Sequence, residues 1–263
     1  MITGAAKLAG IMGWPIAHSR SPALHGFWLN EHKIDGAYVP LAVSPNRLEQ
    51  ALRALPALGF RGCNLTIPHK QTALRVMDQV DDFALRIGAM NTVIVRPDGS
   101  LEGSNTDVFG FWENLHEQAP DWQAGAGPAV VLGAGGSARS VVAALSAAGV
   151  EEIRLVNRTI GRAEALACDL AAPKTRITAH QWDSRADVLS GVGILVNTTS
   201  LGMDKEPPLD IDLGRLPPAA VVVDIVYVPL ETRLLAAARQ RGNPVVDGLG
   251  MLLHQGRPGF AAW

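Results

Sequence analysis

Short aliphatic runs alternate with segments of helical periodicity along the first hundred residues. The runs with strand character are 7–13, 37–43, 63–67 and 92–96. The segments with helical character are 22–32, 45–58 and a stretch that leads into position 87. Residues 97–100, Pro-Asp-Gly-Ser, are typical of a turn between two short antiparallel strands. The alternation as a whole predicts a mostly parallel sheet covered by helices.

A stretch rich in Gly, Ala and Pro at 120–128 interrupts this pattern, and a second unit of the same kind follows it. Its predicted strands are 129–132, 153–156, 194–197 and 221–226, and its predicted helices are 136–148 and 160–171. Residues 230–240 are amphipathic and could lead back to the first unit. The chain is therefore expected to form two α/β domains, the second of them doubly wound.

Composition and charge narrow the class of protein. With 48% hydrophobic and 18% charged residues, the chain resembles an ordinary globular protein. Its net charge of -2 gives no electrostatic reason to bind nucleic acid or an anionic membrane. We expect a cytoplasmic protein with reduced thiols, because no export signal or long apolar run is visible and Cys63 and Cys168 have no ligand-like spacing. No metal site is expected.

A glycine-rich turn joins a predicted strand to a predicted helix at the start of the second unit. Gly133 permits the tight turn, Gly135 lets the backbone approach a pyrophosphate, and Ala138 allows close helix–strand packing. The N-terminus of the following helix offers free N–H groups to phosphates. Residues of this loop, Gly133, Ala134, Gly135, Gly136, Ser137 and Ala138, are thus predicted to bind a dinucleotide.

The end of the next strand indicates which dinucleotide. NAD-binding domains usually place a carboxylate there for the ribose hydroxyls, whereas this chain has Asn157, Arg158 and Thr159, with Arg162 close behind. Arg158 and Arg162 can pair with a 2′-phosphate and stack on adenine. The alternative is that both are solvated arginines near a helix end. We expect the cofactor to be NADP.

Several further motifs occur in a fixed order. They are Ser19-Arg20-Ser21-Pro22, Asn64-Leu65-Thr66-Ile67-Pro68-His69-Lys70, Gly88-Ala89-Met90-Asn91-Thr92, Asn105-Thr106-Asp107, Asn197-Thr198-Thr199, Asp224-Ile225-Val226-Tyr227 and Asp247-Gly248-Leu249-Gly250-Met251. In this order the chain resembles the shikimate dehydrogenase family over essentially its whole length. The resemblance implies NADPH-dependent, reversible reduction of 3-dehydroshikimate to shikimate in the biosynthesis of chorismate and aromatic amino acids. It also implies a catalytic domain at 1–107 and 243–263, and an inserted Rossmann-type NADP domain at 108–242.

The resemblance implies a catalytic dyad. Reduction of a ketone builds negative charge on its oxygen, so a placed proton donor is needed. Lys70 would give this proton and take it back in reverse, and Asp107 would orient Lys70 and keep it charged. On the residues alone, Lys70 could be a solvated side chain and Asp107 a helix cap. Which of the two is the formal acid–base stays open.

The remaining site residues also come from the resemblance. Ser19 and Ser21 would hold the substrate carboxylate, although Ser21 could instead cap a helix that starts at Pro22. The other substrate residues would be Asn64, Thr66, Asn91, Asp107, Tyr227 and Gln255. Residues near the nicotinamide and ribose would be Thr199, Met203, Val226, Gly248 and Met251.

Two other functions stay open. One is a quinate/shikimate dehydrogenase of dual specificity, which would be expected to prefer NAD and to carry an acidic residue near Asn157. The other is a catalytically silent NADP-sensing module, which would be expected to lack Lys70 or Asp107. The expected partner is a small-molecule substrate, and the expected state is a monomer or a homodimer.

Overall fold

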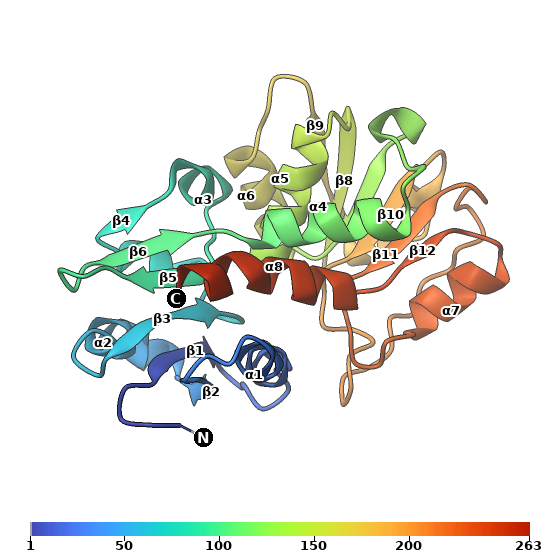
Figure 1. Cartoon of the computed structure of the whole chain (residues 1–263). Helices are drawn as coiled ribbons and strands as arrows, with labels where there is room; N and C mark the ends of the chain where they lie inside the picture. The colour runs from blue at the N-terminus through green and yellow to red at the C-terminus, as the bar shows by residue number, and fades with distance from the viewer. Residues whose placement is uncertain (1) are drawn as a thin grey trace. The chain divides into compact units, whose positions relative to one another are not determined.

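The chain folds into two compact units in a computed structural model that describes residues 2–263 (Figure 1). The first unit contains the described residues up to Thr106 together with Gln255–Trp263, and the second contains Asp107–His254. The second unit thus extends past position 242, because Val245–Val246 adds an edge strand to its sheet. The assignment of 1–107 and 243–263 to the substrate, and of 108–242 to NADP, stays a prediction.

The first unit is built on a six-stranded mixed sheet with the order β2-β1-β3-β5-β6-β4. Its strands are β1 (Lys7–Gly13), β2 (Gly36–Ala42), β3 (Phe60–Leu65), β4 (Gln79–Val80), β5 (Thr92–Val95) and β6 (Leu101–Ser104). Its helices are α1 (Ser21–Glu31), α2 (Leu48–Ala54) and α3 (Asp82–Ile87), and it includes the last turns of α8 (Leu249–Ala262). The strands β1, β2 and β3 run parallel, and β5 pairs antiparallel with β3 and with β6.

The second unit is a six-stranded sheet whose recorded strand pairs are all parallel, with the order β12-β11-β10-β7-β8-β9. Its strands are β7 (Ala129–Leu132), β8 (Glu152–Asn157), β9 (Arg176–Gln181), β10 (Ile194–Asn197), β11 (Val221–Asp224) and β12 (Val245–Val246). Its helices are α4 (Asp107–Gln118), α5 (Gly136–Ala147), α6 (Ile160–Asp169) and α7 (Arg233–Gln240), with the first turns of α8. The strand order reverses between β7 and β10, which is where doubly wound sheets bind dinucleotides.

Alternate residues of the second sheet face two separate cores. Val131 of β7 packs in a cluster with residues of α4, α5 and α6, such as Phe111 and Leu145. The next residue, Leu132, packs in a second cluster with α7 through Leu234. A parallel sheet that is covered on both faces needs apolar residues at every strand position, and this explains why its strands appear as continuous aliphatic runs.

The predicted fold class, two α/β units with a Rossmann-type second unit, is confirmed. The segment 45–58 is shorter than predicted: it is a turn of 3₁₀ helix, Pro45–Arg47, followed by α2, which ends at Ala54. The turn at 97–100 joins β5 to β6 as an antiparallel hairpin, as predicted. No described helix is long and apolar enough to cross a membrane.

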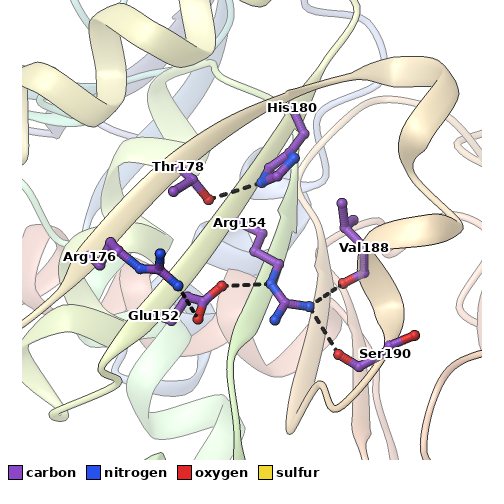
Figure 2. A network of polar contacts seen from close by, with 7 residues as sticks. All are labelled: Glu152, Arg154, Arg176, Thr178, His180, Val188 and Ser190. Atoms are coloured by element: carbon purple, nitrogen blue, oxygen red, sulfur yellow. Dashed lines mark hydrogen bonds and ion pairs between the residues drawn. The ribbon is translucent and has the colours of Figure 1, made fainter.

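A polar network ties β8 to β9 near the start of both strands (Figure 2). Arg154 donates to Glu152 at 2.8 Å and to the carbonyl oxygens of Val188 and Ser190 at 2.7 and 3.0 Å. Arg176 donates to the other oxygen of Glu152 at 2.8 Å, and the hydrogen bond from Arg154 is the main reason why the pKa of Glu152 is lowered. Because nucleotides bind at the carboxyl ends of such strands, this network at the opposite end has a structural role.

Candidate active site

The two serines of the first motif lie at the start of α1. Ser21 is buried and is the first residue of the helix, and its backbone N–H donates to the Ser19 hydroxyl at 3.3 Å. The N-cap position is Arg20, and no side chain caps this helix end. The alternative in which Ser21 caps a helix starting at Pro22 is therefore wrong, because the helix begins one residue earlier. Its hydroxyl is not used for capping.

Asn64 lies near the end of β3 and is almost fully buried. Its Oδ1 accepts from the Tyr38 hydroxyl at 2.6 Å. Its Nδ2 donates to the carbonyl oxygen of Asn91 at 3.1 Å and to Oγ1 of Thr92 at 3.2 Å. Two of the predicted substrate residues, Asn64 and Asn91, are thus brought together by the pairing of β3 with β5.

Asn91 joins the C-terminal segment of the first unit to its sheet. Its Nδ2 donates to Oε1 of Gln255 at 3.1 Å and to Oγ1 of Thr106 at 3.0 Å. The backbone N–H of Thr106 donates to Oδ1 of Asn91 at 2.8 Å, and the Thr106 hydroxyl donates to the carbonyl oxygen of Gln255 at 2.9 Å. Gln255 is therefore held beside Asn91 although 164 positions separate them.

Thr66 and Lys70 lie on the loop that follows β3. The backbone N–H of Thr66 donates to the carbonyl oxygen of Met12 at 2.9 Å, and the carbonyl oxygen of Lys70 accepts from Met90 at 2.8 Å. Lys70 is half-buried. These bonds anchor its backbone beside the residue that precedes Asn91.

Asp107 and Tyr227 belong to the second unit. Asp107 is almost fully buried in the first turn of α4 and follows Thr106 directly in the chain. Tyr227 is half-buried and lies between Val226 and a cis peptide bond at Val228–Pro229.

The glycine loop joins β7 to the N-terminus of α5. Gly133 has φ of +109°, and a Cβ there would lie 2.7 Å from Oγ1 of Thr198. Gly135 is the N-cap of α5, and a Cβ added there would meet no atom within 4 Å, which leaves open space beside the helix N-terminus. Ala138 is fully buried against the sheet. These residues fit a phosphate group at the N-terminus of α5.

The end of β8 presents two exposed arginines, Arg158 and Arg162, beside exposed Thr159. Asn157 donates through Nδ2 to the carbonyl oxygen of Thr159 at 2.8 Å, which shapes the turn into α6. Within residues 2–263, neither arginine has an ion-pair partner. Two unpaired guanidinium groups at this strand end fit the 2′-phosphate of NADP.

A buried carboxylate organises the ends of β10 and β11. Asp224 is fully buried and accepts hydrogen bonds from Asn197 at 2.9 Å, from the backbone N–H of Val226 at 3.1 Å and from the Thr232 hydroxyl at 2.7 Å. Burial raises the pKa of Asp224 to about 6, against the opposing effect of these bonds. Asn197 in turn accepts from the Thr199 hydroxyl at 2.7 Å. Thr199 and Val226 thus share one network.

The other predicted cofactor residues are placed at loops of the second unit. Met203 is half-buried, and Met251 is buried in the core cluster of α4 to α6. Gly248 approaches the backbone so closely that a Cβ would lie 2.3 Å from the carbonyl oxygen of Ile225. Only a glycine fits at this position, which follows β12 and lies against the backbone just after β11.

Several residues that connect the predicted site residues to one another are not among those predicted from the sequence. They are Tyr38, Thr92, Thr106, Asn197 and Asp224. All but Tyr38 lie inside the quoted motifs, so each could have been singled out as a polar residue within two positions of a predicted site residue. Nothing in the sequence marked Tyr38, because it lies in an ordinary strand pattern.

Known protein families and individual proteins are similar to this chain in sequence. A model of the shikimate dehydrogenase substrate-binding domain matches residues 11–93, and a model of the shikimate/quinate 5-dehydrogenase family matches residues 117–203. A shikimate dehydrogenase (NADP(+)) of Rhodospirillum rubrum is 62% identical over 264 residues, which cover 100% of this chain and 93% of that protein.

Two solved structures are similar along almost the whole chain. The shikimate 5-dehydrogenase of Thermus thermophilus, in complex with NADP(H) and shikimate, is 38% identical with a TM-score of 0.85, covering 98% of this chain and 93% of that one. A quinate dehydrogenase of Corynebacterium glutamicum in complex with NAD is 32% identical with a TM-score of 0.89, and it covers the same shares.

Proposed function

The chain belongs to the shikimate dehydrogenase family, and from this premise we propose that Lys70 and Asp107 transfer the proton in its reaction. The protein is an NADP-dependent oxidoreductase that reversibly reduces 3-dehydroshikimate to shikimate in aromatic biosynthesis. NADPH, when bound, supplies the hydride. The protein's own residues have to hold the substrate, exclude water and deliver a proton to the ketone oxygen.

Lys70 is the proton donor in this proposal. During reduction its Nζ gives a proton to the oxygen of the substrate ketone, and in the reverse direction it takes the proton from the hydroxyl. The Asp107 carboxylate orients Lys70. The arrangement of the first unit supports this assignment: Met90 binds the backbone of Lys70, and Asn91 binds Thr106, the residue before Asp107.

Substrate contacts are proposed for a set of polar residues. Ser19 and Ser21 hold the carboxylate, and Asn64, Thr66, Asn91, Asp107, Tyr227 and Gln255 hold the ring hydroxyls. Ser21, Asn64, Asn91 and Gln255 are buried polar groups that the fold has already ordered. Such groups reject an analogue that lacks a hydroxyl, because one of them is then left unpaired.

Cofactor contacts are proposed for the glycine loop and the end of β8. Gly133 to Ala138 receive the pyrophosphate, Arg158 and Arg162 receive the 2′-phosphate, and Asn157 and Thr159 shape the adenosine side. Thr199, Met203, Val226, Gly248 and Met251 are the residues proposed for the nicotinamide half. The open space at Gly135 is the observation that best supports this placement of the phosphates.

The first experiment is reduction of NADP⁺ with shikimate, followed at 340 nm, and repeated with quinate and with NAD⁺. Activity confined to shikimate and NADP⁺ supports the assignment of Ser21, Arg158 and Lys70. Efficient use of quinate or NAD⁺ would instead support the dual-specificity alternative, for which the similar quinate dehydrogenase is a precedent. NADP binding without turnover of any pair would support a sensing module.

The second experiment tests the dyad with Lys70→Ala. We expect turnover to be lost while the affinity for NADP⁺, measured by calorimetry, stays as in the unaltered protein. An equal loss of cofactor affinity would contradict the assigned role. We also propose that the enzyme works in the cytoplasm as a monomer or a homodimer, which cell fractionation and light scattering can test.

A further inference from the structure

The hydroxyl of Tyr38 contacts two of the proposed substrate residues, although Tyr38 itself is in none of the motifs. Tyr38 lies in β2, is buried, and donates to Oδ1 of Asn64 at 2.6 Å. The Ser21 side chain lies close enough to the same phenol to lower the pKa of Tyr38 through a hydrogen bond. Because the single phenol proton is used on Asn64, Ser21 is the donor in that bond, and its hydroxyl can turn to a carboxylate when one is present. One phenol therefore connects the proposed carboxylate site with the proposed hydroxyl site.

The orientation of the Asn64 amide is fixed by its partners. Its Nδ2 lies 3.1 Å from the carbonyl oxygen of Asn91, which can only accept, so this end must be the NH₂ group. The second N–H is directed at Oγ1 of Thr92, 3.2 Å away. Both donors of Asn64 are thus used inside the protein. Its Oδ1 accepts from Tyr38 and keeps one lone pair, so a substrate hydroxyl that meets Asn64 has to donate to that oxygen.

The ring of Tyr38 is held in place by a cluster of aromatic residues. It is stacked on His25, with ring centroids 3.9 Å apart and an interplanar angle of 4°, and the Trp263 ring lies 6.0 Å away. Burial lowers the pKa of His25 to about 4, so this ring is neutral near pH 7. Burial also raises the pKa of Tyr38, which keeps the phenol protonated and able to donate.

The two ends of Tyr38 have different surroundings. The aromatic cluster lines an apolar cavity of about 390 Å³, and the described residues around it include Tyr38 and His25 but neither Ser21 nor Asn64. The ring is therefore on the apolar side and the hydroxyl on the polar side. A phenylalanine would satisfy the packing equally well, so the hydroxyl calls for a separate explanation.

We propose that Tyr38 is a positioning residue, whose hydroxyl holds Asn64 as a hydrogen-bond acceptor and thereby makes the site selective for a substrate with a hydroxyl at that point. This inference rests on the proposed function of Asn64 as a substrate residue. It assigns no step of proton or hydride transfer to Tyr38. Its consequence appears in substrate affinity and selectivity rather than in the rate of the chemical step.

The test is Tyr38→Phe, which keeps the ring stack and removes only the hydroxyl. We expect the KM for shikimate to rise about 3- to 10-fold, the range expected for loss of one neutral hydrogen bond, while kcat changes less than about 2-fold. The affinity for NADP⁺ should be unchanged. Phe260→Leu is the matched control, because it alters the cluster around His25 without touching the hydroxyl.

A second measurement separates positioning from general damage. Shikimate analogues that lack the 4- or the 5-hydroxyl are compared with shikimate by kcat/KM in each variant. In the unaltered protein, the analogue without the hydroxyl that Asn64 binds should be strongly disfavoured. In Tyr38→Phe this discrimination should shrink by about 3-fold or more, whereas Phe260→Leu should leave it unchanged.

Unchanged KM and unchanged discrimination in Tyr38→Phe would overturn the inference, while normal turnover by the unaltered enzyme leaves the proposed function standing. A parallel fall in kcat and melting temperature in both Tyr38→Phe and Phe260→Leu, with discrimination intact, would also overturn it in favour of a packing role. Failure of the unaltered protein to oxidise shikimate would overturn both proposals.

Discussion

Asp224 gives a prediction about pH that can be worked through from the structure. Its carboxyl is fully buried, and burial raises its pKa from 3.8 to about 6, although three hydrogen bonds oppose the change. The folded chain therefore binds this proton more tightly than the unfolded chain does. The stability that follows from this is fully present below pH 3.8 and is lost as the pH rises through about 6.

The size of this effect follows from the difference in pKa. At about 1.4 kcal/mol per pH unit, a rise from 3.8 to about 6 corresponds to about 3 kcal/mol of unfolding free energy. Other carboxyls act in the opposite direction, because hydrogen bonds lower the pKa of Asp78 and Glu152. Their contribution cancels when two variants are compared at each pH.

The comparison is between the unaltered protein and Asp224→Asn, by urea unfolding at several pH values between about 4 and 8. The free energy of unfolding of Asp224→Asn, relative to the unaltered protein, should increase by about 2–3 kcal/mol over this range. The test is how the difference in unfolding free energy changes with pH. Its value at any one pH also depends on how Thr232 adapts to an amide. The exposed Asp210 provides the control, since Asp210→Asn should give a flat difference.

A flat or falling difference for Asp224→Asn would refute the reasoning. A carbon-13 NMR titration of the Asp224 carboxyl provides a direct check, with an expected midpoint near pH 6. A midpoint near 4 would show that the hydrogen bonds from Asn197, Val226 and Thr232 fully offset burial.

Three further predictions follow from the site. Arg158→Ala should raise the KM for NADP⁺ by about 10-fold or more with little change for NAD⁺, because a charge-assisted bond to the 2′-phosphate is lost; equal effects on both cofactors would contradict the assignment. Gly133→Ala should weaken NADP⁺ binding in calorimetry, since a Cβ there meets Thr198 at 2.7 Å, whereas Gly149→Ala, with φ of +96° but open space, should leave binding intact. Burial lowers the pKa of His25 from 6.5 to about 4, so the unfolded chain takes up this proton before the folded chain does as the pH falls. The free energy of unfolding should therefore decrease as the pH falls from 6.5 to about 4. A His25→Phe variant whose stability falls by the same amount over this range would disprove this.

The sequence by itself determined the local elements and indicated NADP as the cofactor. Each signal lies within a short stretch of the sequence: the periods of the strands and helices, the turn at Gly133, and Arg158 at the end of a strand. Such short stretches specify the local backbone structure, and the fold class predicted from them is the one observed. Short edge strands such as β4 and β12 were not predicted, because two residues are too few to show a period.

Only the tertiary structure decided which polar side chains meet. Tyr38 reaches Asn64 because β2 and β3 flank β1 in the sheet, and no spacing in the chain records that order. Gln255 reaches Asn91 because the end of the chain returns to the first unit. The direction of a hydrogen bond, and hence what a substrate must offer, is set by partners that are distant in the sequence. For this reason Tyr38 could be found only in the folded protein.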